Sequence, residues 1–331
     1  MRTRPPDVDD GQLIEAAQRG WGAPIAAVEY VAVGGGSHHW RAMDARGALV
    51  WLTLDDLDDK PFLGITRDAV LDGLQKALET AVRLHKSALD FVVAPERTRS
   101  GAVLLQLDQR YALAVYPYLE GAAFAWGAPL PPRDRQVLLD LLIRLHRATP
   151  TVAATAAEIA PELAARDVLE SALRDTARSW SSSGPFGEPA REVVARHAHS
   201  ISQLLLEFDR IVREVRQRQG SPVISHGEPH PSNVMHTASG LRLLDWDTVG
   251  LALPERDLWW LAEPGNTLER YAHATGRRVD AQALHLYRLR WFLDDIISSV
   301  RRLRAPHTRT VDAQRSWDFL KHSMEDNAWM H

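Results

Sequence analysis

The sequence predicts an α+β protein with a β-rich first third and a mostly helical remainder. Alternating and β-branched segments typical of strands concentrate before residue 117. Apolar residues at helical spacing dominate after residue 132. The pattern changes across Tyr116–Gly121, which we interpret as a junction between two lobes. We therefore expect a first lobe at residues 1–116, a linker at residues 117–121 and a helical lobe at residues 122–331.

The first lobe is expected to begin with an amphipathic helix and to continue as strands around a glycine turn. The turn is Gly34-Gly35-Gly36-Ser37, which lies between two strand candidates. In order, we expect a helix at Gln12–Arg19, strands at Val28–Val33 and Leu49–Leu54, a helix at Thr66–His85, and strands at Val103–Leu107 and Tyr111–Tyr116.

The second lobe is expected to be helical, with two short strands around a polar loop. The strand candidates are Val223–Ser225 and Leu241–Leu244, and Ser181–Pro189 is typical of a loop. Apolar periodicity predicts helices at Arg133–His146, Glu162–Trp180, Glu192–Arg218 and Ala281–Arg304.

Composition excludes several kinds of protein. The 331 residues include 45% hydrophobic residues, which is enough for a large core, and the formal net charge of −4 is not typical of a nucleic-acid binder. The absence of cysteine excludes disulfides, thiolate metal sites and cysteine nucleophiles. No run approaches the roughly 20 apolar residues that span a bilayer, and the charged, proline-containing start is not typical of a secretory signal. We expect a cytoplasmic protein without membrane or nucleic-acid partners.

Two short motifs carry the chemistry. The first is His226-Gly227-Glu228-Pro229-His230-Pro231-Ser232-Asn233, and the second is Leu244-Asp245-Trp246-Asp247 after a short apolar strand. Phosphoryl transfer to a hydroxyl group needs one carboxylate to position the nucleophile and accept its proton. It also needs amide and carboxylate oxygens to hold magnesium against the phosphates. Each motif alone occurs by chance in loops, but the joint pattern is far more specific.

These motifs resemble those of the aminoglycoside phosphotransferase family. His226–Asn233 resembles its catalytic loop, usually written H-G-D-x-H-x-x-N, and Leu244–Asp247 resembles its metal motif. Pro254–Leu258 resembles the P-x-x-D-L-A segment of many members, and Tyr287–Ile297 is similar to a C-terminal helix of the spectinomycin phosphotransferase branch. The resemblance implies a bilobal protein-kinase-like fold. It also implies magnesium-dependent transfer of phosphate from ATP or GTP to a hydroxyl group of a small molecule.

Carried over position by position, the resemblance gives each residue a role. Glu228 stands at the catalytic base position, and Asn233 and Asp245 stand at the magnesium positions. His226, Asp247 and Asp257 are interpreted as residues that brace the loop. The nucleotide is expected to contact Gly34, Gly35, Gly36, Ser37, Thr53, Tyr116, Tyr118 and Leu119.

Two positions depart from the family pattern. Glu228 replaces an aspartate and is one methylene longer, so geometry decides whether it reaches the proton. Thr53 occupies the apparent position of a strand lysine that binds the α- and β-phosphates, and threonine supplies no positive charge. The nearby side chains that could substitute for this lysine are Lys60, Arg41, His38 and His39. Lys60 follows an acidic stretch, so the alternative is that it is a solvated surface residue.

The acceptor end of the site is less specific. By resemblance to the spectinomycin branch, Asp294 and Asp295 lie on a helix that lines the acceptor pocket; a solvated face paired with Arg290 or Arg301 is the alternative. Antibiotics, and with them antibiotic resistance, are favoured over sugars, choline and amino acids. The main alternative function is a pseudoenzyme that binds nucleotide or ligand without transfer, and Thr53 supports it.

Overall fold

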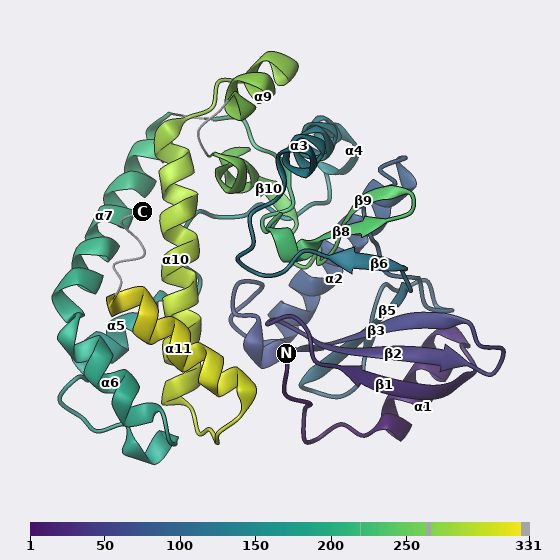
Figure 1. The fold of residues 1–331 in the computed structure, drawn as a ribbon, viewed down its shortest axis with the longest axis horizontal. Coiled ribbons are helices and arrows are strands. Elements are labelled where there is room, and N and C mark those ends of the chain that lie inside the picture. Colours follow the sequence, from purple (N-terminus) through teal and green to yellow (C-terminus); the bar gives the residue numbers. More distant parts are fainter. Residues whose placement is uncertain (219, 263–265, 326–331) are drawn as a thin grey trace. The chain divides into compact units, whose positions relative to one another are not determined.

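The computed structural model describes residues 1–218, 220–262 and 266–325. They form two compact units, which are described separately. The first comprises Thr3–Ala160 and Ser221–Leu284, and the second comprises Pro161–Gly220 and the chain from His285 onward. All described strands belong to the first unit, and the second is helical (Figure 1). The α+β class predicted from the sequence is confirmed, while the lobe boundary at residues 117–121 falls inside the first unit and stays a prediction.

A five-stranded antiparallel sheet in the order β1–β2–β3–β5–β4 opens the first unit (Figure 1). The second strand, which pairs with both of its neighbours, is absent from the sequence prediction. Its sequence HHWRAMD alternates between buried and more exposed residues, but the buried His38 conceals that pattern. The strands are β1 (Ile25–Val31), β2 (His38–Asp44), β3 (Leu49–Asp56), β4 (Leu105–Gln106) and β5 (Tyr111–Pro117).

Two helices cover opposite faces of this sheet. Alternate residues of a strand point to opposite faces, and on β5 Leu113 joins the core shared with α1 (Asp10–Trp21). Ala112 and Ala114 join the core shared with α2 (Arg67–Lys86). The sheet is therefore the layer between two apolar cores.

Strand β3 follows the same alternation and brings polar side chains to one face. Leu52 and Leu54 are fully buried in the α1 core. Thr53 and Asp55 point to the other face, although both are also buried. A buried threonine and a buried carboxylate need polar partners, and these partners lie in the candidate site described below.

Beyond β5, a second core holds two small sheets against helices. One sheet pairs β7 with β10, and the other has the order β6–β8–β9. The buried residues include Leu142, Ile224, Leu243 and Trp246. The elements are β6 (Gly121–Ala123), α3 (Pro132–Arg147), α4 (Thr149–Val152), β7 (Val223–Ser225), β8 (Val234–Thr237), β9 (Gly240–Leu243), β10 (Gly250–Ala252), α8 (Glu255–Leu258) and α9 (Thr267–Thr275).

The helices of the second unit correct two sequence predictions. The expected helix at Glu162–Trp180 is only nine residues long as α5 (Arg166–Arg174). The expected helix at Glu192–Arg218 is two helices that meet at His197, and the first of them begins inside the expected loop. Ion pairs such as that between Arg166 and Asp209 join α5 to α7. The remaining helices are α6 (Gly187–Arg196), α7 (Ala198–Gln217), α10 (Ala281–Arg304) and α11 (Val311–Glu325).

Within the described ranges, helices that combine the length and apolar character needed to cross a bilayer are absent.

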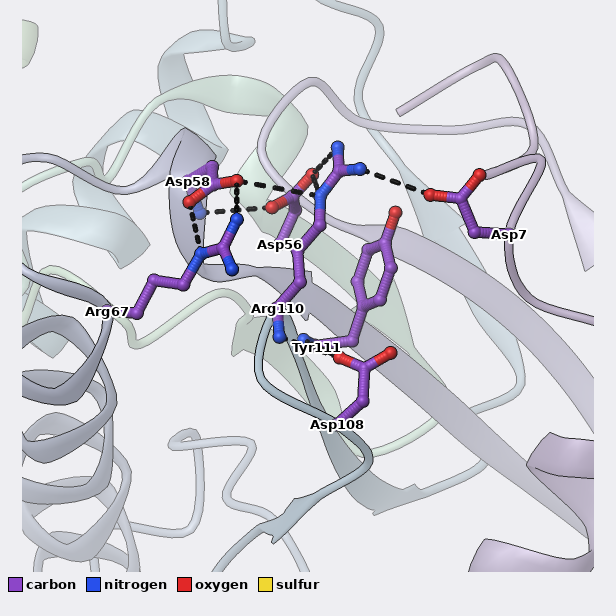
Figure 2. Close-up of polar contacts among 7 residues, drawn as sticks. All are labelled: Asp7, Asp56, Asp58, Arg67, Asp108, Arg110 and Tyr111. Atoms are coloured by element: carbon purple, nitrogen blue, oxygen red, sulfur yellow. Dashed lines mark hydrogen bonds and ion pairs between the residues drawn. The ribbon is translucent and has the colours of Figure 1, made fainter.

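A cluster of ion pairs fixes the end of β3 and the short 3-10 turn η1 (Leu57–Asp59) that follows it (Figure 2). Arg110, at the start of β5, donates to the buried carboxylate of Asp56 at 2.6 and 3.0 Å. Its backbone carbonyl accepts from Leu57 N–H at 2.9 Å. Asp58 carries the cluster on to Arg67, which donates to it at 2.6 and 2.7 Å. The turn is therefore anchored by both backbone and charge.

We predict that Arg110→Ala lowers the free energy of unfolding by about 1–2 kcal/mol, because it leaves the buried Asp56 carboxylate without its main partner. Urea denaturation measures the change. Arg67→Ala removes an arginine from the exposed end of the same cluster and is the matched control, with little change expected. Equal losses in the two variants would contradict this assignment.

Candidate active site

The segment His226–Asn233 joins β7 to β8, and hydrogen bonds hold it in place. The His226 ring donates from Nε2 to the carbonyl of Leu244 at 2.8 Å and accepts at Nδ1 from the backbone N–H of Glu228 at 3.2 Å. Burial lowers the pKa of His226. A neutral ring offers one donor and one acceptor, as these two bonds require. His226 thus braces the loop, in agreement with the sequence interpretation.

The buried carboxylate of Asp257 fixes the start of the loop. It accepts the backbone N–H of His226 at 2.9 Å and that of Gly227 at 2.6 Å. His146 Nε2 lies 3.0 Å from the same carboxylate, and its Nδ1 lies 2.8 Å from the Tyr271 hydroxyl. Burial by itself raises the pKa of Asp257, but the hydrogen bond from His146 and nearby positive charge lower it overall. The carboxylate therefore stays ionised and holds both N–H groups.

Gly227 is required by close packing. It adopts φ +101°, and a Cβ at this position would lie 2.3 Å from Nη2 of Arg256. The Arg256 guanidinium donates to the Ser225 hydroxyl and to the Thr248 carbonyl, both at 2.9 Å. It therefore cannot move aside without losing these bonds. The glycine of the motif is explained by this buried arginine.

Asn233 and Asp245 stand close to each other at the ends of paired strands. Strand β8 begins directly after Asn233, whose backbone carbonyl accepts the N–H of Leu244 at 2.9 Å. Asn233 Nδ2 donates to the Glu228 carbonyl at 3.0 Å, so its amide oxygen is turned away from that carbonyl. Asp245 adopts φ +61°, a left-handed conformation that aspartate tolerates better than most residues. The chain turns sharply here and frees the carboxylate from the strand.

Electrostatic effects place Glu228 and Asp245 in one region. Asp245 keeps an exposed surface, but partial loss of solvation, followed by the negative charge of Asp247, raises its pKa well above the usual value. The charges of Glu228 and Asp55 act in the same direction, and the Lys60 ammonium opposes them. Charge effects of this kind require proximity. The structure thus brings Glu228 and Asp245 together, with Asn233 beside them.

Lys60 is the main correction to the sequence analysis. The solvated alternative is wrong, because the side chain is only 1% exposed. Its Nζ lies 2.5 Å from Asp247 Oδ2, 2.9 Å from Asp55 Oδ1 and 3.2 Å from the Ser37 hydroxyl. Burial alone would lower the pKa of Lys60, but Asp247, Asp55 and Asp245 raise it well above its usual value. The group is a charged ammonium inside the site.

Thr53 and its neighbours supply no comparable charge. The Thr53 hydroxyl lies 3.2 Å from Nδ1 of His39. Burial and nearby positive groups lower the pKa of His39 to about 3, so the ring is neutral. His38 and His39 belong to β2, and neither is exposed. Glu79, on α2, forms an ion pair with Arg97 at 2.6 Å.

The glycine turn Gly34–Ser37 connects β1 to β2 above this cluster. Ser37 is buried, and its hydroxyl donates to Asp55 Oδ1 at 2.5 Å. A Cβ built on Gly36 would lie 3.9 Å from the Lys60 Nζ, whereas one on Gly35 would meet nothing within 4 Å. The turn therefore passes close to the ammonium and still has open space at its tip.

The remaining predicted residues lie at two places. Tyr116 ends β5, and burial, followed by the charge of Asp55, raises its pKa well above the usual value. Tyr118 and Leu119 follow between β5 and β6 and are half-buried. Asp294 and Asp295 lie on α10 in the second unit, where Asp294 accepts from Arg290 at 3.3 Å. The binding roles given to these residues stay predictions.

An aromatic group lies beside Glu228. The buried His230 ring packs edge-on against Trp126 and Trp260, with centroids 4.8 and 5.4 Å apart. Its Nε2 lies 3.8 Å from the Glu228 carboxylate, and burial lowers the pKa of His230 to about 3. The Trp126 side chain is 54% exposed.

Comparison with known proteins defines the class. The profile of the phosphotransferase enzyme family matches residues 44–294. Among solved structures, spectinomycin phosphotransferase APH(9)-Ia in complex with ADP and spectinomycin is similar with a TM-score of 0.72 and 17% identity, covering 96% of this chain and 95% of that one. Choline kinase LicA from Streptococcus pneumoniae is similar with a TM-score of 0.57 and 12% identity, covering 96% and 99%.

Amicoumacin kinase hAmiN, solved with AMP-PNP, calcium and its ligand, is similar with a TM-score of 0.57 and 13% identity, covering 97% and 94%. A search of curated protein sequences finds no match. These similarities confirm the kinase-like fold, and the protein is of the small-molecule phosphotransferase class. The chain belongs to the phosphotransferase enzyme family, as the sequence motifs predicted.

We predict that Asp257→Asn lowers the free energy of unfolding at pH 7 by about 3 kcal/mol, because it weakens the hydrogen bonds that a buried carboxylate accepts from two backbone N–H groups. The pKa of Asp257 is lower in the folded protein than its usual 3.8. Its contribution is therefore fully present above pH 3.8 and is lost as the pH falls through the lowered folded value. Urea denaturation between pH 7 and pH 3 measures the free energy of unfolding of both proteins. The difference between wild type and variant should become smaller below pH 3.8.

Asp140→Asn is the control, since Asp140 forms an exposed ion pair with Arg270 on the surface. It should change stability little at any pH. A gap for Asp257→Asn that is equal at pH 7 and at pH 3 would show that the ionised carboxylate does not hold the loop.

Proposed function

We propose that this protein transfers the γ-phosphoryl group of ATP or GTP to a hydroxyl group of a small molecule. One observation carries the proposal: the partly exposed Glu228 lies on a braced loop within electrostatic range of Asp245, beside the amide of Asn233. A base, and oxygen donors for a cation, are the protein groups that this reaction needs. The buried loop supports them rigidly, which favours catalysis by positioning.

The roles follow from the chemistry. The acceptor oxygen forms a bond to the γ-phosphorus while the bond from that phosphorus to the bridging β-phosphate oxygen breaks. The acceptor proton passes to a carboxylate oxygen of Glu228. The nucleoside diphosphate leaves with the electron pair of the broken bond. Glu228 is one methylene longer than the aspartate of the family pattern. Its backbone N–H donates to the His226 ring, which fixes the backbone from which this longer side chain extends.

The donor set suits magnesium. The amide oxygen of Asn233 and the carboxylate of Asp245 would hold the cation, because hard oxygen ligands are those that magnesium prefers. Loss of solvation and the neighbouring charge of Asp247 raise the pKa of Asp245, and a bound divalent cation would favour its ionised form. In the part of the chain that the structure describes, His, Cys, Asp and Glu side chains form no cage of three or more. Magnesium commonly takes its remaining ligands from water and phosphate, and when bound it neutralises phosphate charge.

The nucleotide and acceptor are assigned by position and by the relatives. Gly34–Ser37 would cover the phosphates, and Tyr116, Tyr118 and Leu119 would contact the base. Trp126, exposed beside His230 and Glu228, offers an aromatic face to an acceptor ring. Relatives solved with spectinomycin and with amicoumacin favour an antibiotic acceptor and a role in resistance.

Glu228→Gln is expected to reduce transfer by about 10²- to 10⁴-fold, because the amide cannot accept the acceptor proton. A screen with γ-³²P-labelled ATP and GTP over aminoglycosides, spectinomycin, nucleoside antibiotics and small alcohols finds the acceptor and measures the rate. The exposed Glu269→Gln on α9 is the control and should transfer normally. Normal turnover by Glu228→Gln would remove the base assignment, and nucleotide binding without transfer to any acceptor would favour the pseudoenzyme.

Asp245→Asn is expected to raise the magnesium concentration for half-maximal rate at least tenfold, or to abolish transfer, because a neutral amide binds the cation less strongly. Asparagine also tolerates the left-handed backbone at this position, so the turn should persist. The magnesium dependence of the rate is the measurement, and the exposed Asp68→Asn on α2 is the control. An unchanged magnesium dependence would contradict the metal assignment.

A further inference from the structure

The strand position that holds the phosphate-binding lysine in the family pattern is filled here by Thr53. Its hydroxyl is already engaged with His39, and the low pKa of His39 makes that pair neutral. Arg41 points elsewhere, since it forms an ion pair with the exposed Glu29. Thr53, His39 and Arg41 therefore offer no positive charge to a nucleotide under the glycine turn. The charge must come from another segment.

Lys60 directly follows η1, beyond the end of β3, and brings an ammonium to this region. The group contacts three elements at once: Ser37 of the glycine turn, Asp55 of β3 and Asp247 of the second motif. These three elements are the ones between which the phosphates of a nucleotide would lie if the proposed function holds. Position, and not only charge, therefore suits the ammonium to this task.

Burial of this ammonium is costly and needs an explanation. Transfer of a charged group out of water costs several kcal/mol even after relaxation of the protein. Here Asp247 and Asp55 offset the cost, but a hydrophobic residue would fill a purely structural position more cheaply. The turn η1, which precedes Lys60, is itself anchored by the ion pair between Arg110 and Asp56. These contacts hold the Lys60 ammonium at one defined position, which a residue that only filled space would not require.

We propose that Lys60 is the residue that binds the phosphate oxygens of the nucleotide, in place of a lysine on the strand. In the nucleotide-free protein, Asp55 and Asp247 hold the ammonium in position. When the nucleotide binds, phosphate oxygens also accept hydrogen bonds from the Lys60 ammonium, which has three N–H groups. The contact with Ser37 is the longest of its present contacts, at 3.2 Å, and is the one that a phosphate oxygen would replace. This inference rests on the proposed function. It adds a phosphate-binding residue that the local sequence around Lys60 does not identify by itself.

Lys60→Met tests the inference by calorimetric titration with Mg-ATP, Mg-GTP and adenosine. The variant should bind the triphosphate at least tenfold more weakly than the wild type and bind adenosine equally well, because adenosine lacks the phosphates. Equal affinity for the triphosphate would overturn the inference. Equal weakening for adenosine and triphosphate would also overturn it, since that pattern indicates a structural role.

Two further variants complete the design. Lys60→Met combined with Asp55→Asn removes one negative charge together with the positive one, so it tests the same loss in a protein with less unpaired charge. It should show the same selective loss of triphosphate affinity, and normal affinity would count against Lys60. Lys76→Met removes an exposed lysine of α2 and should bind both ligands normally. If the wild type binds no nucleotide, the proposed function itself fails, which separates that outcome from failure of the Lys60 assignment alone.

Discussion

The contact of one buried ammonium with two carboxylates is the interaction on which the candidate site depends. Lys60 joins the glycine turn, strand β3 and the Asp245–Asp247 motif, which lie far apart in the sequence. Each buried carboxylate would be costly alone, and together with the ammonium they form a cluster with defined geometry. Beside this cluster, loss of solvation and the charges of Asp247, Glu228 and Asp55 raise the pKa of Asp245, and the Lys60 ammonium opposes them. A divalent cation and a polyphosphate fit this balance, since the cation meets the carboxylates and the phosphates meet the lysine.

Two supports hold this cluster from outside. On one side, Arg110 pairs with the buried Asp56 and fixes the turn that carries Lys60. On the other side, Asp257 holds two backbone N–H groups at the start of the catalytic loop. Both supports involve a carboxylate in a buried position, satisfied by charged or N–H donors. Catalysis of phosphoryl transfer relies mainly on positioning and charge neutralisation. Residues that hold the site in place are therefore expected in such a fold.

The sequence predicted the fold class and the family, because these depend on the change from strand to helix pattern and on the joint spacing of two motifs. The roles of Glu228, Asn233 and Asp245 in the site stay predictions. The sequence analysis failed where the decisive contact is long-range. Lys60 follows an acidic run that resembles a solvated surface, and its partner Asp247 lies 187 positions later. Strand alternation turns Asp55 inward, and only the assembled sheet shows what it meets. Strand β2 was missed because a histidine takes a core position, and the break at His197 was missed because apolar periodicity continues across it.

The most direct test of the account is a crystal structure of the protein with magnesium and a non-hydrolysable ATP or GTP analogue. The account predicts phosphate oxygens within hydrogen-bond distance of the Lys60 Nζ, and magnesium bound by the Asn233 amide and the Asp245 carboxylate. Glu228 should face open space next to the γ-phosphate. Phosphates bound far from Lys60, with its ammonium still held only by Asp55, Asp247 and Ser37, would contradict the account.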